Sequence, residues 1–96
     1  MAQGIRNLHP DVQQFVESLQ RIHSLLVADH EQFWCHRIHK VIQLAQKSDG
    51  HSVELFLGFF GGMGSFSDLV LNGSDVANST LSEERSNAYG IAQNLR

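Results

Sequence analysis

Residues 53–66 read Val-Glu-Leu-Phe-Leu-Gly-Phe-Phe-Gly-Gly-Met-Gly-Ser-Phe. The first eight of them are apolar on nearly every side, so they must be buried whether they form a helix or a strand. We expect a short helix, because Asp49 or Ser52 can cap its start and the pair Gly61-Gly62 can end it in a left-handed conformation. A central strand remains the alternative, since the pattern of so short an apolar run fits both.

Three glycines in four positions, at residues 61–64, exclude regular helix because each adds a large entropic cost. We expect a shaped loop in which Met63 and Phe66 fill the core and Ser65 or Asp68 bonds exposed backbone N–H groups. The loop is no phosphate cradle, since no Lys followed by Ser or Thr comes after the glycines. An extended segment is expected at 66–71. The turn signal after it, at residues 72–73, is not followed by strand alternation.

Amphipathic patterns predict two helices before this stretch. The first runs from Pro10 to about Val27, where apolar residues recur every three or four positions. The second begins at a capping box, residues 29–32, with Asp29 as the capping residue, and ends near Lys47. The short link favours an antiparallel pair, although one kinked, continuous helix remains possible.

A last helix is expected from a second capping box, Thr80-Leu81-Ser82-Glu83, to a point close to Arg96, with Arg85 beneath its first turn. The fold class is therefore all-α: a bundle of three to four helices with a glycine-rich loop and a short extended segment. The 96 residues can support only one core, so residues 1–96 are expected to form a single domain.

Composition narrows the function. The net charge of -3 is mild and no run of Lys and Arg is present, so nucleic acid is not an expected partner. A single cysteine, Cys35, suits a reducing compartment. Neither a secretory signal nor an apolar stretch of about 20 residues, as a membrane span requires, is visible. We therefore expect a cytoplasmic protein without a membrane partner.

Cys35, His36 and His39 form the sharpest cluster of chemically active side chains, with Cys35 and His39 four apart on one helix face. A zinc site needs three or four ligands, and no second Cys or His pair has the usual ligand spacing. A nucleophilic Cys35–His39 pair lacks a third member to orient it. We therefore predict no catalytic residues, no metal and no cofactor.

Residues 59–71 resemble a family of small bacterial proteins. That family carries a Gly-Gly-Met-Gly-Ser core followed by an aromatic residue or leucine, a polar residue, Asp and an aliphatic triplet. The similarity extends over about the last half of the chain, and Ser67 stands where asparagine is more usual. The matching residues, which the resemblance implies chiefly shape the fold, are Gly61, Gly62, Met63, Gly64, Ser65 and Asp68. Members look like immunity proteins or accessory factors that bind a secreted toxin and block it without chemistry.

The resemblance implies a non-catalytic immunity protein that covers the active site of a cognate toxin. The acidic excess suits a toxin with a basic substrate cleft. The candidate contact residues are acidic or aromatic: Asp68, Glu54, Glu83, Glu84 and Trp34. Two alternatives remain open, a metal- or ligand-binding protein that uses Cys35, His36 and His39, and a homo-oligomeric module, such as a homodimer, that buries an aromatic face.

Overall fold

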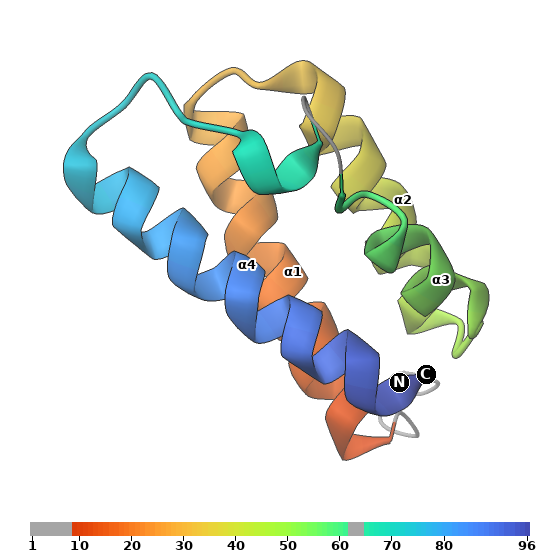
Figure 1. The fold of residues 1–96 in the computed structure, drawn as a ribbon. Helices are drawn as coiled ribbons and strands as arrows, with labels where there is room; N and C mark the ends of the chain where they lie inside the picture. Colours follow the sequence, from red (N-terminus) through yellow and green to blue (C-terminus); the bar gives the residue numbers. More distant parts are fainter. Residues whose placement is uncertain (1–8, 62–64) are drawn as a thin grey trace.

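The structure is a computed structural model that describes residues 9–61 and 65–96. Its elements, in chain order, are α1 (Pro10–Ala28), α2 (Gln32–Gln46), α3 (His51–Leu57), the 3-10 helix η2 (Phe66–Asp68) and α4 (Asp75–Leu95) (Figure 1). No strand occurs among the described residues, so the predicted all-α class is confirmed and the strand alternative for residues 53–60 is wrong. None of the helices in these two ranges is long and apolar enough to cross a membrane.

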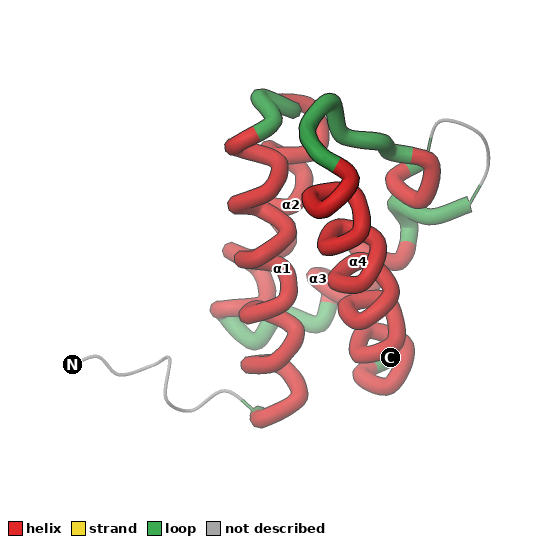
Figure 2. Tube along the Cα trace, turned by 90° about the vertical axis from the view of Figure 1, so that its left-hand side faces the viewer, coloured by secondary structure: helices red, strands yellow, loops and turns green. Residues whose placement is uncertain are grey.

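The helices enclose one core because each packs against two others. α1 packs against α2 and α4, and α3 closes the arrangement by packing against α2 and α4 (Figure 2). We call the end of the bundle with the α1–α2 turn, residues 65–74 and the start of α4 the loop end. The opposite end, where α1 begins, α2 turns into α3 and α4 finishes, is called the terminal end (Figure 1).

Aromatic side chains fill the centre of this core. Phe15, Phe56 and Phe66 are fully buried, and the rings of Phe15 and Phe56 meet edge to face with centroids 5.4 Å apart. Phe66 therefore fills the core as predicted. The predicted stripe of α1 is confirmed as well, since its buried apolar residues are Phe15, Val16, Leu19, Ile22 and Leu26.

The link between α1 and α2 corrects the predicted cap. Asp29 follows the end of α1, and Glu31 caps α2 instead, where its side chain accepts a hydrogen bond from the Trp34 N–H at 3.5 Å. His30 has a φ of 59°, a left-handed conformation that interrupts helical geometry, so α1 and α2 are separate helices. The Asp29 carboxylate accepts from the Asn72 N–H at 2.9 Å and so bonds the loop after η2.

Helix α3 is shorter at its end than predicted. Its N-cap is Gly50, which makes no side-chain cap hydrogen bond, so neither Asp49 nor Ser52 is the capping residue that was expected. The Asp49 carboxylate does accept from the His51 N–H at 2.9 Å, and the helix finishes at Leu57. Gly61 is left-handed, with a φ of 102°, yet it lies beyond the helix end and does not cap it. The Phe66 N–H donates to the Phe59 carbonyl at 2.9 Å, which closes the glycine-containing loop. The predictions for Gly62, Met63 and Gly64 lie outside the described residues.

In the last part of the chain, one prediction is wrong and another holds only in part. α4 begins at Asp75, with the Ser74 hydroxyl accepting from the Ala77 N–H at 3.1 Å, so the Thr80–Glu83 box lies inside the helix. Only part of the segment at 66–71 is extended, since it opens with η2. The Ser65 hydroxyl lies 2.7 Å from that of Ser67 and so contacts a side chain instead of the backbone.

Candidate functional site

The five predicted contact residues come from four elements, α2, α3, η2 and α4. Asp68, Glu54 and Glu83 are exposed, but they belong to three different elements, η2, α3 and α4. Glu84 and Trp34 are partly buried. Sequence reasoning selected these five by residue type, whereas their placement depends on which face of each helix meets a neighbour.

Glu84 holds α4 against α1. Its carboxylate accepts hydrogen bonds from the Ser18 hydroxyl at 2.8 Å and from Arg21 Nε at 2.7 Å. Burial raises the pKa of Glu84, but these two hydrogen bonds, the Arg21 charge and a hydrogen bond from Asn87 together lower it below its ordinary value. Glu84 is therefore a charged structural contact between two helices.

Trp34 belongs mainly to the core. Its ring contacts those of Phe59 and Phe66, with centroids 5.4 and 5.0 Å away. The exposed member of this aromatic group is the neighbouring Phe33, which is 54% exposed. The guanidinium carbon of Arg37 lies 3.7 Å from the centre of the Phe33 ring, a cation–π contact that holds the ring in place. Of these two neighbouring aromatic residues, sequence reasoning named Trp34 as a contact residue and missed Phe33.

Exposed apolar side chains gather at the loop end. The four large apolar residues that are exposed among the described residues are Val27, Phe33, Val70 and Val76, which are between 52% and 73% exposed. All four come from elements that meet at this end (Figure 1). Large exposed apolar side chains are informative when they collect in one region, because such regions commonly bind partners.

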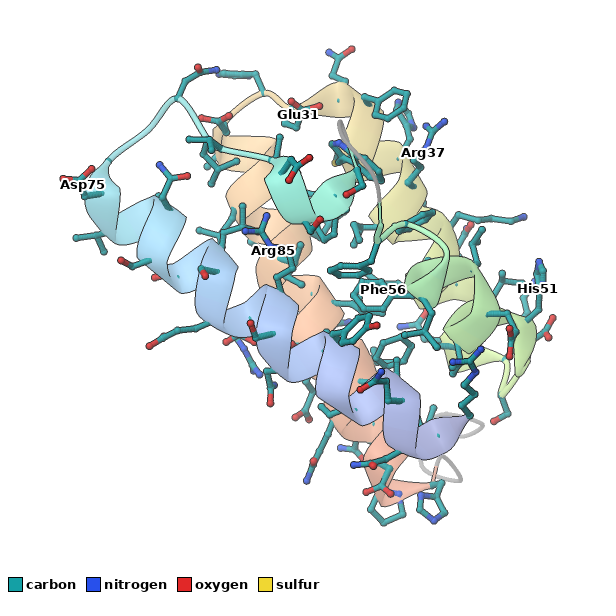
Figure 3. All side chains as sticks on the ribbon, viewed as in Figure 1. Glu31, Arg37, His51, Phe56, Asp75 and Arg85 are labelled. Atoms are coloured by element: carbon teal, nitrogen blue, oxygen red, sulfur yellow. The ribbon has the colours of Figure 1, made fainter. Side chains whose placement is uncertain are left out.

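Acidic side chains are also present at the same end. Four of the chain's ten carboxylates belong to the loop-end elements: Asp29, Glu31, Asp68 and Asp75. Figure 3 shows Glu31 and Asp75 at this end, with Arg37 further along α2. We define the loop-end surface as these four acidic residues together with Val27, Phe33, Val70 and Val76.

Arg85 fixes the backbone that carries part of this surface. From the middle of α4, its Nη1 donates to the carbonyl of Phe66 at 2.9 Å and to that of Leu69 at 3.1 Å. Burial lowers the pKa of Arg85 below its ordinary value, although the nearby charge of Asp68 acts in the opposite direction. The predicted place of Arg85, beneath the first turn of the last helix, is wrong because α4 begins earlier.

Asn78, which also belongs to α4, likewise fixes the backbone of this segment, at Leu71. Its Oδ1 accepts from the Leu71 N–H at 2.7 Å, and its Nδ2 donates to the Leu71 carbonyl at 3.1 Å. Both polar groups of Leu71 are thus satisfied, as a neighbouring strand would satisfy them. Together with Arg85, Asn78 holds the segment that presents Val70.

The predicted Cys35, His36 and His39 cluster is rearranged. Cys35 Sγ lies 3.3 Å from Nε2 of His23 on α1, and the rings of His23 and His39 have centroids 5.8 Å apart. Burial and the nearby His39 lower the pKa of His23. His36 is exposed and takes no part in these contacts. Within residues 9–61 and 65–96, no group of three or more His, Cys, Asp or Glu side chains is arranged to hold a metal ion.

A known sequence family matches the part of the chain that contains the loop-end surface. The family model described as "Domain of unknown function (DUF6966)" matches residues 27–77, more than half of the chain. The chain belongs to this family. The DUF6966 match contains α2, α3, η2 and the first turn of α4, and every residue of the loop-end surface falls inside it. Neither a curated protein nor a solved structure matches the chain.

Arg85 and most of α1 lie outside the DUF6966 match. These parts supply the packing partners of the matched segment, α1 through its buried stripe and α4 through Arg85. The segment that the family shares therefore presents the loop-end surface, and the flanking helices support that segment.

Proposed function

We propose that this DUF6966 protein is a non-catalytic binding protein that neutralises a cognate bacterial toxin by covering its active site with the loop-end surface. The observation that carries the proposal is the gathering of exposed apolar side chains and carboxylates at one end of the bundle. The toxin as partner class follows from the resemblance of residues 59–71 to immunity-like bacterial proteins.

The mixture of side chains suits tight binding to a basic protein. Protein interfaces draw most of their affinity from a few anchors that become fully buried, and Phe33 beneath Arg37 is the best such anchor here. The surrounding carboxylates would attract a basic cleft and speed encounter with it. An enzyme that cleaves or modifies nucleic acid needs such a cleft to hold phosphates, so a toxin of this class fits best.

The proposed place of action is the bacterial cytoplasm, where a toxin must be blocked before it is exported. The free thiol of Cys35 suits that reducing compartment. A stable interface needs roughly 800 Å² from each partner, and eight side chains with their immediate neighbours at the loop end can supply an area of this order.

The proposal is tested by measuring whether the chain protects cells from the toxin. A toxin domain encoded next to this gene is expressed alone and together with the native chain, and growth and co-purification are measured. We expect the native chain to restore growth and to co-purify with the toxin. The variant Phe33→Asp should lose both effects while staying folded, because it places a charge where an apolar anchor is needed.

The control for that experiment is Glu83→Gln, an exposed change on α4 outside the loop-end surface, which should protect like the native chain. Failure of the native chain to protect would refute the proposed function. Full protection by Phe33→Asp would refute the assignment of the surface. If light scattering instead shows a concentration-dependent dimer that Phe33→Asp abolishes, the surface joins copies of this chain and the toxin proposal fails.

A further inference from the structure

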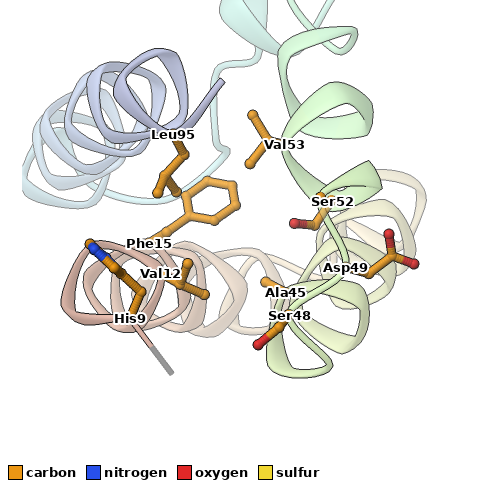
Figure 4. Close-up of a pocket in the computed structure, with 10 residues that line it drawn as sticks. His9, Val12, Phe15, Ala45, Ser48, Asp49, Ser52, Val53 and Leu95 are labelled. Atoms are coloured by element: carbon orange, nitrogen blue, oxygen red, sulfur yellow. The ribbon is translucent and has the colours of Figure 1, made fainter. Parts of the chain in front are cut away.

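A second feature lies at the terminal end, far from the loop-end surface. A cavity of about 290 Å³ opens between the start of α1, the α2–α3 turn and the end of α4 (Figure 4). The apolar part of its lining comes from four helices, through Val12 and Phe15, Ala45, Val53, and Leu95. The rest of the lining is His9, Ser48, Asp49, Gly50 and Ser52. A concave apolar space with few polar groups is the usual form of a small-molecule site.

Ser52 supplies the polar group inside this cavity. The residue is only 3% exposed, and Figure 4 shows its hydroxyl directed toward the space between Phe15 and Ala45. The backbone around it is fixed, since the Ser52 N–H donates to the Asp49 carbonyl at 3.0 Å. The turn that begins α3 therefore holds the backbone that carries the hydroxyl.

The Ser52 hydroxyl has no hydrogen-bond partner among the described residues. The other buried polar residue of these ranges, Ser18, shows the normal arrangement, because its hydroxyl donates to Glu84 at 2.8 Å. Buried polar groups are nearly always paired, and an unpaired one destabilises the fold. A hydroxyl left unpaired and directed into a cavity has the chemistry of a ligand contact.

The size and the rim of the cavity define the ligand. A dry cavity of about 150 Å³ can hold benzene, so a space about twice that size fits roughly ten non-hydrogen atoms. Asp49 and His9 lie at the rim, and the Asp49 carboxylate disfavours an anion there. The Ser52 hydroxyl can donate one hydrogen bond and accept another, which a ligand hydroxyl can reciprocate.

We propose that this cavity is a binding site for a compact, uncharged, apolar phenol or alcohol whose hydroxyl pairs with Ser52. The site is separate from the loop-end surface, so it stands or falls independently of the proposed function.

The experiment compares two probes of nearly equal shape, 4-methylphenol and 1,4-xylene, which differ by a hydroxyl against a methyl group. Each is titrated into the full chain, and backbone amide chemical shifts are followed. We expect 4-methylphenol to shift amides at Val12, Ala45 and Val53 and to bind at least about fivefold more tightly than 1,4-xylene, the discrimination of one hydrogen bond. Absence of shifts at the cavity, or equal affinity for both probes, would overturn the proposal.

Two variants test the role of the hydroxyl. Ser52→Ala should reduce the affinity for 4-methylphenol to that for 1,4-xylene, and Ser52→Val should weaken both probes because it also fills space. Ser86→Ala, an exposed change on α4, should leave both affinities unchanged. Retained selectivity in Ser52→Ala would overturn the proposal.

A second measurement needs no ligand. If the hydroxyl is unpaired in the free protein, Ser52→Ala should raise the midpoint of thermal unfolding, because it removes a buried group that gains nothing from the fold. An unchanged or lower midpoint would show that the hydroxyl is satisfied within the protein and would overturn the inference.

Discussion

The guanidinium of Arg85 joins two segments that are distant along the chain but adjacent at the loop end. It bonds the carbonyls of Phe66, the first residue of η2, and of Leu69, which follows η2. No periodicity in the sequence distinguishes it from an ordinary arginine on a helix surface. Charged side chains that satisfy buried backbone carbonyls contribute more than exposed ion pairs, since the alternative is an unpaired carbonyl.

Replacing Arg85 therefore has a defined cost. Arg85→Met should lower the free energy of unfolding by about 2 kcal/mol, because the two carbonyls lose a charged donor while the apolar part of the side chain is kept. Urea unfolding at pH 7 measures the change. Lys40→Met, an exposed substitution on α2, is the control and should have little effect. A difference of less than about 0.5 kcal/mol between the two variants would contradict this role of Arg85.

Glu84 makes the stability of the fold dependent on pH. Its pKa is lowered in the folded state, so it binds a proton less readily there than in the unfolded chain. The stabilisation is present above the ordinary pKa of a glutamate and is lost as the pH falls through the lower, folded-state pKa. We expect the native chain to lose stability between about pH 5 and pH 3, and Glu84→Gln to show a weaker dependence.

Urea unfolding of both proteins across that pH range is the measurement, with Glu83→Gln as the matched control. Glu83 is exposed at the neighbouring position, so its variant should follow the native curve. Identical pH profiles for the native chain and Glu84→Gln would contradict the stabilising role given to the Ser18 and Arg21 hydrogen bonds.

At the scale of elements, the helices were easier to predict than their ends. Pro10 and the regular stripe after it placed α1 nearly to the residue, since both are local signals. The start of α4 was misplaced because the Thr80–Glu83 box is the more regular local pattern. The true start, at Asp75 with Ser74 as the cap, is supported by the hydrogen bonds of Asn78 to Leu71. These bonds form only because the chain reverses direction between Leu71 and Asn78.

The turn after α3 gives a prediction at this scale. Gly61 has a φ of 102°, where any side chain is strained, whereas Gly90 lies within α4 and an added Cβ would meet nothing within 4 Å. Gly61→Ala should lower the free energy of unfolding by about 1–2 kcal/mol. Gly90→Ala should raise it by about 0.5–1 kcal/mol, since alanine favours helix.

Both glycine variants are compared with the native chain by urea unfolding. The opposite signs are the informative result, because the same chemical change is made at two positions that differ in backbone geometry. A stabilising Gly61→Ala would show that the left-handed turn is not needed to join α3 to η2.

At the scale of the whole molecule, a single core connects all four helices, and this predicts cooperative unfolding. Trp34 is the only tryptophan and packs on Phe59 and Phe66 at the loop end. Its fluorescence should therefore change at the same urea concentration as the helical circular dichroism signal. A fluorescence transition at lower urea would mean that the loop end unfolds separately from the helices.

Only part of the candidate site could be predicted from the sequence, because the site depends on how the helices pack in the whole molecule. Residue type identified acidic and aromatic side chains, but the packing of α1 against α4 turned Glu84 inward and left Glu83 in solvent. Phe33 was not selected, although it is 54% exposed at the start of α2. Ser52 was treated only as a helix cap, and its cavity is formed by helices that are remote in sequence.

The arrangement of the two ends of the bundle also determines where a tag or another domain can be attached. The backbone enters α1 and leaves α4 at the terminal end, so an affinity tag, a fluorescent protein or a neighbouring domain joined through either helix would emerge on the side opposite Phe33. Such a fusion leaves the recognition face open. It also crowds the mouth of the cavity beside His9 and Leu95, so ligand measurements call for the untagged chain.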